Sequence, residues 1–237
     1  MRAIVISDIH GNIDVLRALE RRLGERLAEF ERVICMGDLV DYGPYPNEVI
    51  EWIRERATDV VRGNHDHAVA TGAPCESSPS YLQASIATRA RLRDRLTPDA
   101  IDYLSRLPLE ARVTVGQQSW LLIHATPREM LHDYVPAGAT DEQWRAALGD
   151  RTGQQVLMGH THMPFGRPFD GGFLANPGSI GMPKDGSPHG SYAILDGHVI
   201  QFLRIAYDPE PMIRELAALD LSGAIFTQLA RSFRTGM

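Results

Sequence analysis

The sequence has no long hydrophobic run, no low-complexity tract and no internal repeat. A membrane-spanning helix needs about 18 or more consecutive apolar residues, and no segment is that long. The apolar run at residues 3–6 is also far too short for the hydrophobic region of a signal peptide. We therefore expect a soluble, cytoplasmic protein that has no membrane partner.

Basic segments and cysteines are also scarce. The 24 Lys and Arg residues face 30 Asp and Glu residues, the formal charge is −6, and no basic run forms a stripe. Binding of duplex nucleic acid through bulk electrostatics is therefore disfavoured, although a small phosphorylated substrate needs only a local positive site. Cys35 and Cys75 could form one disulfide at most, and we expect both to be buried or idle thiols.

The composition is that of an ordinary globular protein. The chain has 237 residues, of which 43% are hydrophobic and 23% are charged. This length lies within the range of a single α/β domain with one large core. We therefore predict one domain over residues 1–237, while no feature of the sequence indicates the oligomeric state.

The N-terminal part alternates between apolar strands and amphipathic helices. Strands are expected at 2–7, 33–36 and 59–61, which are short apolar runs rich in β-branched residues. Helices are expected at 12–30, with Asn12 as the N-cap, and at 47–56. This order predicts a mainly parallel sheet, whose ligand groups should lie at the carboxyl ends of its strands.

The rest of the chain changes character twice. Residues 73–107 combine a Pro/Ser-rich segment with helical spacing, and we predict a helical insertion over the site. Strand-like runs then recur and need a second sheet to hold them, and C-terminal helices are expected over 208–231. The predicted fold class is α/β, with two mixed β-sheets packed as a sandwich and flanked by helices. The later strands are predicted at 113–115, 120–123, 156–158, 173–175, 192–195 and 199–205.

Polar clusters follow the first two strands. Asp8 and His10 occupy alternate positions, so on an extended segment both side chains would face one side and could bind a single ion. Gly37-Asp38 adds a carboxylate whose two oxygens can bridge two cations. Each cluster alone has an ordinary explanation, because Asp and His are common in turns and at helix caps.

Three further clusters follow later strands. The segment Gly63-Asn64-His65-Asp66 brings an amide oxygen, an imidazole and a carboxylate to the third strand end. His124 ends an apolar run, where the ordinary alternative is a hydrogen-bonded core histidine. The segment Gly159-His160-Thr161-His162 adds two imidazoles at alternate positions. Independent accidents would not usually align five such clusters, and we interpret them as one metal centre.

In chain order the clusters read Asp-x-His, Gly-Asp, Gly-Asn-His-Asp, His and Gly-His-x-His. From residue 3 to about residue 205, this set resembles the calcineurin-like metallophosphoesterase superfamily, and specifically its small bacterial phosphodiesterase-type members. The resemblance implies a four-layer αββα fold with two metal ions. It further implies that Asp38 bridges the two ions. The other implied ligands are Asp8, His10 and His162 for the first metal, and Asn64, His124 and His160 for the second.

The resemblance also implies a reaction. His65 matches the catalytic histidine of the family, and Asp66 matches the carboxylate that orients it. The implied activity is hydrolysis of phosphate esters, most of all phosphodiesters, by a hydroxide formed between two cations roughly 3.5 to 4 Å apart, with His65 as general acid. Ligands without thiolate suit Mn²⁺, Fe, Zn²⁺ or Ni²⁺, and the resemblance favours manganese or iron.

Several alternatives stay open. The same site could act on phosphomonoesters or dinucleoside polyphosphates, or on phosphoproteins, although Tyr42 stands where the serine/threonine-type protein phosphatases carry Arg. The fold could also be a non-catalytic metal-binding scaffold, against which the intact His65 and ligand set argue. A helical His-Asp phosphohydrolase is disfavoured, because apolar Val60-Val61 places His65 and Asp66 at a strand end. Three further side chains could contact phosphate: Arg128, Lys184 and His189. We interpret them as solvated surface groups.

Overall fold

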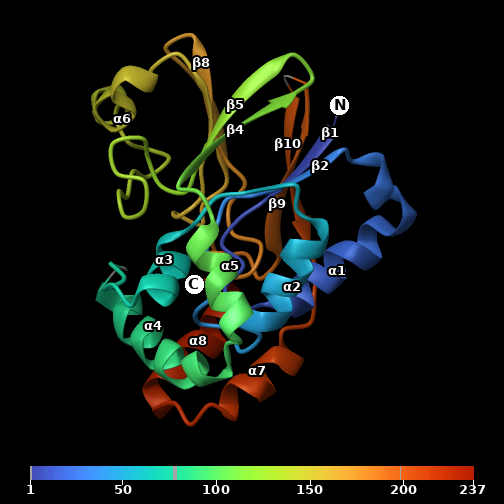
Figure 1. Cartoon of the computed structure of the whole chain (residues 1–237), viewed down its shortest axis with the longest axis vertical. Coiled ribbons are helices and arrows are strands. Elements are labelled where there is room, and N and C mark those ends of the chain that lie inside the picture. Colours follow the sequence, from blue (N-terminus) through green and yellow to red (C-terminus); the bar gives the residue numbers. More distant parts are fainter. Residues whose placement is uncertain (1, 77–78, 198) are drawn as a thin grey trace.

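The computed structural model describes residues 2–76, 79–197 and 199–237. In this part of the chain two five-stranded sheets form, and helices lie on their outer faces (Figure 1). Both sheets mix parallel and antiparallel pairs. The predicted fold class is therefore confirmed.

The first sheet combines the N-terminal strands with the last two strands. The N-terminal strands pair in parallel, as the alternation of strands and helices predicts. The last two strands join them in antiparallel fashion, so the expectation that these two lie in the second sheet is wrong. Both edges of the first strand are thereby paired. The strand order is β10 (Val199–Ile205), β9 (Gly190–Asp196), β1 (Arg2–Ile6), β2 (Arg32–Cys35) and β3 (Asp59–Val60).

The second sheet holds the remaining strands and packs face to face against the first. Its three middle strands run parallel, and each edge strand is antiparallel to its neighbour. One edge strand was not predicted, because Gly166 and Pro168 interrupt its apolar pattern, and Pro is tolerated at a sheet edge. The strand order is β4 (Glu110–Val115), β5 (Gln118–Ile123), β6 (Gln155–Leu157), β8 (Gly172–Asn176) and β7 (Phe165–Phe169).

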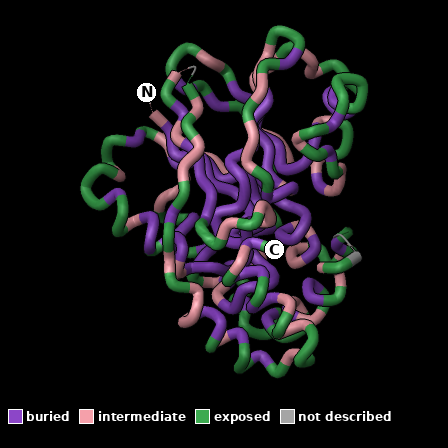
Figure 2. The backbone as a smooth tube through the Cα atoms, turned by 180° about the vertical axis from the view of Figure 1, so that it is seen from behind, coloured by how far each residue is buried: buried purple, intermediate pink, exposed green. Residues whose placement is uncertain are grey.

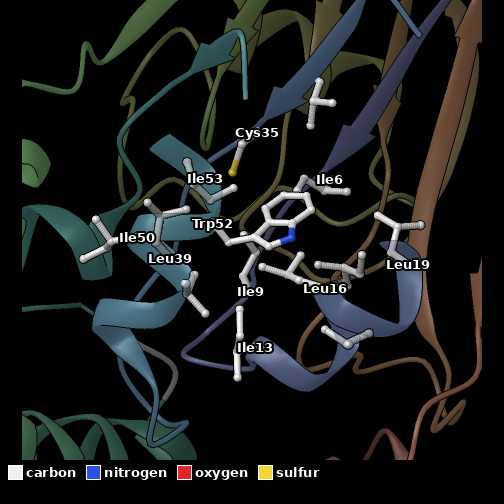
Figure 3. Close-up of a cluster of buried hydrophobic side chains, with 14 of the residues drawn as sticks. Ile6, Ile9, Ile13, Leu16, Leu19, Cys35, Leu39, Ile50, Trp52 and Ile53 are labelled. Atoms are coloured by element: carbon white, nitrogen blue, oxygen red, sulfur yellow. The ribbon is translucent and has the colours of Figure 1, made fainter. Parts of the chain in front are cut away.

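The largest buried region lies between the sheets and beneath the helices of the first sheet (Figure 2). Side chains of β1 alternate between two cores: Ala3 and Val5 face the second sheet, while Ile4 and Ile6 face the helices. Trp52 is central to the helix-side core (Figure 3). This packing holds the carboxyl ends of β1 and β2 in fixed positions.

Two helices cover the first sheet. In α1 (Ile13–Leu23) the predicted N-cap is present, since the Asn12 side chain accepts a hydrogen bond from Val15 N at 3.2 Å. The helix ends earlier than predicted, because Gly24 adopts a positive φ of 52° and a 3₁₀ segment (Gly24–Glu29) follows. The second helix, α2 (Pro46–Arg56), lies where it was expected.

The predicted insertion and the C-terminal segment pack on each other at one end of the molecule (Figure 1). Phe233 is buried there, and the last helix continues to Thr235, beyond the predicted boundary. Within the described residues, no helix is both long and apolar enough to cross a bilayer. The helices that pack there are α4 (Pro79–Leu92), α7 (Glu210–Ala217) and α8 (Gly223–Thr235), whereas α5 (Pro98–Arg106) of the insertion packs on the helix-side core of the first sheet.

Two helices were not predicted. The first, α3 (Asn64–Thr71), has little amphipathic pattern, because its buried first turn consists of polar residues. The second, α6 (Asp141–Leu148), covers the outer face of the second sheet and begins at a Thr140–Gln143 capping box. That capping box was a readable helix-start signal.

Candidate metal centre

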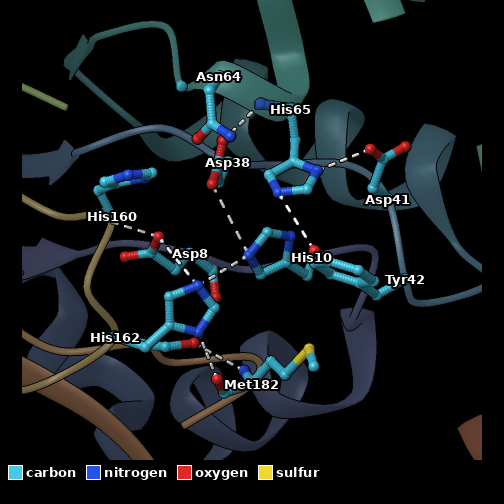
Figure 4. A network of polar contacts seen from close by, with 12 residues as sticks. Asp8, His10, Asp38, Asp41, Tyr42, Asn64, His65, His160, His162 and Met182 are labelled. Carbon is cyan, nitrogen blue, oxygen red and sulfur yellow. Dashed lines mark hydrogen bonds and ion pairs between the residues drawn. The ribbon is translucent and has the colours of Figure 1, made fainter. Parts of the chain in front are cut away.

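The five predicted clusters meet at one place. The clusters that begin at Asp8, Asp38 and Asn64 follow β1, β2 and β3, and the loops after β5 and β6 carry His124, His160 and His162. Backbone hydrogen bonds tie these loops together, including Ile9 N to Asp38 O at 2.8 Å and Gly159 N to His124 O at 2.8 Å. Side chains from distant segments therefore point toward one another (Figure 4).

The first group consists of Asp8, His10, Asp38 and His162, all buried. His10 Nδ1 donates to Val40 O at 3.0 Å, and His162 Nδ1 donates to Met182 O at 2.6 Å. Because a carbonyl can only accept, both protons lie on Nδ1, and the two Nε2 atoms face each other as lone pairs at 3.2 Å. Two facing lone pairs repel, whereas a cation between them would be bound by both.

The second group consists of Asp38, His124 and His160. His124 Nδ1 lies 2.6 Å from Met36 O, and His124 Nε2 lies 3.1 Å from Asn64 Oδ1. Cys75 orients the amide, because Asn64 Nδ2 donates to its sulfur at 3.2 Å and leaves Oδ1 turned toward the histidine. Cys75 is a buried thiol as expected, but it is not idle.

Asp38 belongs to both groups. Its Oδ2 lies 3.3 Å from His124 Nε2 and 3.8 Å from His10 Nε2, while Oδ1 accepts from the backbone N of His65 at 3.0 Å. The carboxylate therefore sits between the two groups, where one oxygen could reach both ions. Asp8 Oδ2 is buried with no hydrogen-bond partner, which is costly unless a cation binds there. The residues thus fit a pair of divalent cations.

The loop backbones differ from the expected extended geometry. Non-glycine residues adopt positive φ in a small, unfavourable region that costs about 1–3 kcal/mol each and is concentrated at functional sites. The expectation that alternate residues of a strand direct the paired ligands is therefore wrong. Gly63 permits the close approach, since a Cβ there would lie 2.1 Å from Asp38 Oδ1. Among the predicted ligands, those with positive φ are Asp8 (54°), His10 (52°), Asp38 (57°), His160 (66°) and His162 (60°).

Burial and mutual contact shift the proton affinities of the site. Burial raises the pKa of Asp8 to about 7 and lowers the pKa of His10 and of His160 to about 3. Burial alone would also lower the pKa of His124, but the charge and hydrogen bond of Asp38 raise it to about 9. Without metal, His124 therefore holds a proton in the place where a cation would bind.

Metal binding should consequently depend on pH. Below a pKa of about 7 for Asp8 and about 9 for His124, both groups must lose a proton before they can ligate, so acid weakens binding and alkali strengthens it. At about pH 6 we expect Mn²⁺ binding to release about two protons. Isothermal titration calorimetry in buffers of different ionisation enthalpy measures this number. Binding that releases no proton, with an affinity that stays the same from about pH 6 to about pH 8, would contradict the assignment.

His65 lies beside the second group, but its partner is not the predicted one. His65 Nδ1 donates to Asp41 Oδ2 at 2.7 Å. Asp66 instead accepts from the backbone N of Asp38 at 2.9 Å, of Leu39 at 2.8 Å and of Gly63 at 3.0 Å. The assignment of Asp66 as the carboxylate that orients His65 is therefore wrong. Asp66 holds the loop that carries Asp38.

The helical insertion supports Asp41. Arg89 of α4 forms two contacts with that carboxylate, one of them from Nε to Oδ1 at 3.3 Å, and Ser85 Oγ donates to Oδ2 at 3.1 Å. Burial alone would raise the pKa of Asp41, but His65 and Arg89 lower it. Burial alone would likewise lower the pKa of His65, but the oxygens of Tyr42, Asp38 and Asp41 raise it well above its usual value. These contacts therefore favour the protonated form of His65.

The three residues considered for phosphate contact differ in the structure. Arg128 is exposed and pairs with Asp133 at 2.5 Å, and His189 is exposed. Lys184 is partly buried and lines a cavity of about 320 Å³ over the metal groups, so its interpretation as a solvated surface group is wrong. Asp41 was readable, since it follows Asp38 within one motif, whereas nothing in the sequence singled out Arg89.

Two mixed sheets between helices, with carboxylate and imidazole loops meeting at the strand ends, define the class as that of the metallophosphoesterases. A family model described as the calcineurin-like phosphoesterase superfamily domain matches residues 1–198. The chain belongs to this superfamily, and the predicted resemblance is confirmed. It is a phosphoric ester hydrolase of a metal-dependent family.

Relatives match nearly the whole chain. Phosphodiesterase YfcE of Escherichia coli K12 is 25% identical over 230 residues, which are 92% of this chain and 98% of that protein. An uncharacterised protein of Methanocaldococcus jannaschii is 28% identical over 222 residues, which are 86% of this chain and 87% of that protein. The crystal structure of a metallophosphoesterase from Sphaerobacter thermophilus has a TM-score of 0.79 and 26% identity. The match covers 97% of this chain and 98% of that chain.

Proposed function

We propose that this chain hydrolyses phosphate esters, with phosphodiesters as the first substrate class, at a centre of two divalent metal ions. One observation carries the proposal: in the first group, the unprotonated Nε2 atoms of His10 and His162 face each other at 3.2 Å beside the carboxylates of Asp8 and Asp38. The similarity to a phosphodiesterase, YfcE, supports diesters. The proposed ligands are Asp8, His10, His162 and Asp38 for one ion, and Asp38, Asn64, His124 and His160 for the other.

The ligand set indicates which ions are suitable. Imidazoles, carboxylates and one amide, with no thiolate, suit manganese or iron first, and zinc or nickel as alternatives. When bound, a pair of such cations would lower the pKa of a shared water and neutralise charge on phosphoryl oxygens. Asp38 would set the separation of the ions, because its Oδ2 faces both groups.

His65 is the proposed general acid. Its Nδ1 is held by Asp41 at 2.7 Å, so the proton on Nε2 is free to be given to the leaving oxygen. Nε2 lies 3.4 Å from Tyr42 Oη, and both residues line the cavity. Because Asp41 favours the charged imidazole and Arg89 holds Asp41 in place, the proton is available near neutral pH.

The intact acid argues against a non-catalytic scaffold, since a scaffold has no need of His65, Asp41 and Arg89 in contact. Tyr42 argues against a protein phosphatase, because its buried ring fills the position where an Arg would be needed. Phosphomonoesters remain a second substrate class on the same site, since the cavity also holds a cation, Lys184.

Reconstitution with metal tests the proposal. The purified chain is loaded separately with Mn²⁺, Fe²⁺, Zn²⁺ and Ni²⁺, bound metal is measured, and hydrolysis of bis(p-nitrophenyl) phosphate and p-nitrophenyl phosphate is followed. We expect two ions per chain and turnover of the diester. A chain that holds two ions and hydrolyses no phosphate ester would be a scaffold, and the proposed function would be abandoned.

Substitution of Asp41 and of Asp66, one at a time, separates their roles. Asp41→Asn should leave metal content unchanged and slow esters of poor leaving groups by about 10- to 100-fold, the usual effect of losing a supporting partner. Asp66→Asn should lower the melting temperature and the metal content, because Asp66 holds the backbone of the Asp38 loop. Kinetics and thermal unfolding of both variants are compared. Equal effects of the two substitutions on leaving-group dependence would restore the role first assigned to Asp66.

A further inference from the structure

One cation of the cavity has no place in the proposed reaction. The chain has 24 Lys and Arg residues, and Lys184 is its single lysine. It lies in the loop between β8 and β9, two residues after Met182, whose carbonyl oxygen accepts the His162 Nδ1 proton. The loop that fixes a proposed metal ligand therefore also fixes this ammonium group.

In the described part of the chain Lys184 forms no salt bridge, although the carboxylates of Asp8 and Asp38 attract its charge from beyond salt-bridge distance. Its Nζ lies over the Tyr81 ring at 4.7 Å from the centroid. Among residues 2–76, 79–197 and 199–237, no carboxylate pairs with Nζ and no hydrogen bond to it is formed, whereas Arg89 nearby is paired with Asp41. A partly buried ammonium without a partner is unfavourable. A site of this kind is completed by an anion from outside.

The position of the ammonium indicates which anion. Lys184 lines the same cavity as Asp38, His65 and His162. Ring contacts lead from it to the general acid: Tyr81 lies 6.0 Å from Tyr42, and Tyr42 lies 4.9 Å from His65, between ring centroids. A phosphoryl group at the metal groups would therefore have this cation at one side.

The charge of Lys184 would favour some substrates over others. Metal ions would neutralise Asp8 and Asp38, so the positive charge of Lys184 would remain available to the substrate. A simple diester carries one negative charge, which the metal pair already attracts. A substrate with an additional negative charge next to the reacting phosphorus gains more from the ammonium.

We propose that Lys184 is a specificity-determining residue, which binds an anionic oxygen beyond the single charge of a simple phosphodiester. That oxygen belongs either to a terminal phosphate or to a phosphate adjacent to the reacting one. This inference rests on the proposed function, because it assigns a substrate preference to the same site. An ammonium suits this task, since it is a compact point charge with three donors.

Substrate kinetics of two variants test the preference. Lys184→Met removes the charge and keeps an unbranched side chain that is one atom shorter, and Lys184→Arg is the matched control. The substrates are bis(p-nitrophenyl) phosphate, p-nitrophenyl phosphate and a P1,P2-dinucleoside diphosphate. We expect Lys184→Met to lose about 10- to 100-fold in kcat/KM on a substrate with the additional charge, the size of one charge-assisted hydrogen bond, and only a few-fold on the simple diester. Lys184→Arg should retain most of the activity.

The two charged substrates identify the source of the anion. A loss confined to p-nitrophenyl phosphate assigns the terminal phosphate, and a loss confined to the dinucleoside diphosphate assigns the adjacent phosphate. An equal loss on all three substrates, with unchanged metal content, overturns the inference while the proposed function stands. Wild-type protein that binds metal but hydrolyses none of them refutes the proposed function instead.

A second readout does not depend on turnover. Because Lys184 is the single lysine, acetylation by an N-hydroxysuccinimide ester can be followed at this side chain by peptide mass spectrometry. Inorganic phosphate should slow its modification about tenfold in the Mn²⁺-loaded protein, if the anion occupies the ammonium. Chloride at equal ionic strength is the control. Modification at an unchanged rate in saturating phosphate contradicts the proposal whether or not the protein is active.

Discussion

Asp38→Asn should abolish metal binding and activity together. Its carboxylate faces His10 Nε2 at 3.8 Å and His124 Nε2 at 3.3 Å, so an amide there loses the negative charge that both ions would share. Loss of several kcal/mol of charge stabilisation corresponds to a decrease in kcat/KM of at least about 10³-fold. The substitution preserves the volume of the side chain, and Oδ1 can still accept from the backbone N of His65.

Metal content and activity are measured side by side for this variant. The matched control is Asp170→Asn, which removes an exposed carboxylate paired with Arg145 at 2.8 Å and should leave metal content and activity at the wild-type level. Circular dichroism checks that both variants are folded. Asp38→Asn protein that still holds two ions and hydrolyses the diester normally would show that the carboxylate does not bridge.

His65→Gln should separate chemistry from metal binding. The imidazole contacts Asp41 and Tyr42 and is in neither metal-binding group, so we expect full metal content. Removal of a general acid costs roughly 10²- to 10⁴-fold in rate. The loss should be large for alkyl leaving groups and small for p-nitrophenolate, because a good leaving group departs without a proton.

A series of phenyl phosphodiesters of increasing leaving-group pKa measures this dependence. The slope of log kcat against leaving-group pKa should be steeper for the variant than for the wild type. His189→Gln replaces an exposed histidine and serves as the control. Parallel slopes, or loss of metal from the His65 variant, would assign this histidine to another role.

The strand ends and the side chains that gather at them could be predicted from the sequence. Short apolar runs such as residues 3–6 are typical of buried strands, and each run ends at a polar cluster. Parallel strands direct their carboxyl ends to one edge, so the clusters had to meet. The grouping of Asp8, His10 and His162, and of His124 and His160, around Asp38 is what the structure shows.

The orientation of the acid could not be predicted, because it depends on tertiary contacts. Arg89 is one of four arginines in residues 81–96, and helical spacing alone does not tell which of them faces Asp41. The choice between Asp41 and Asp66 depends on the turn after β2, where Asp41 and Tyr42 both have positive φ. Lys184 was misjudged for the same reason, since a loop sequence does not show which cavity it lines.

The insertion is part of the site in this account. Its helix α4 supplies Arg89 and Ser85 to the carboxylate that holds His65, and Tyr81 lies beneath the Lys184 ammonium. Changes in this helix should therefore affect proton donation and substrate choice without direct contact with the metal ligands.

Anomalous diffraction from crystals of the Mn²⁺-loaded protein tests the central claim most directly. The account predicts two strong peaks at the manganese edge, one among Asp8, His10 and His162, the other among Asn64, His124 and His160, with Asp38 in contact with both. A single peak, or peaks away from these side chains, would contradict it.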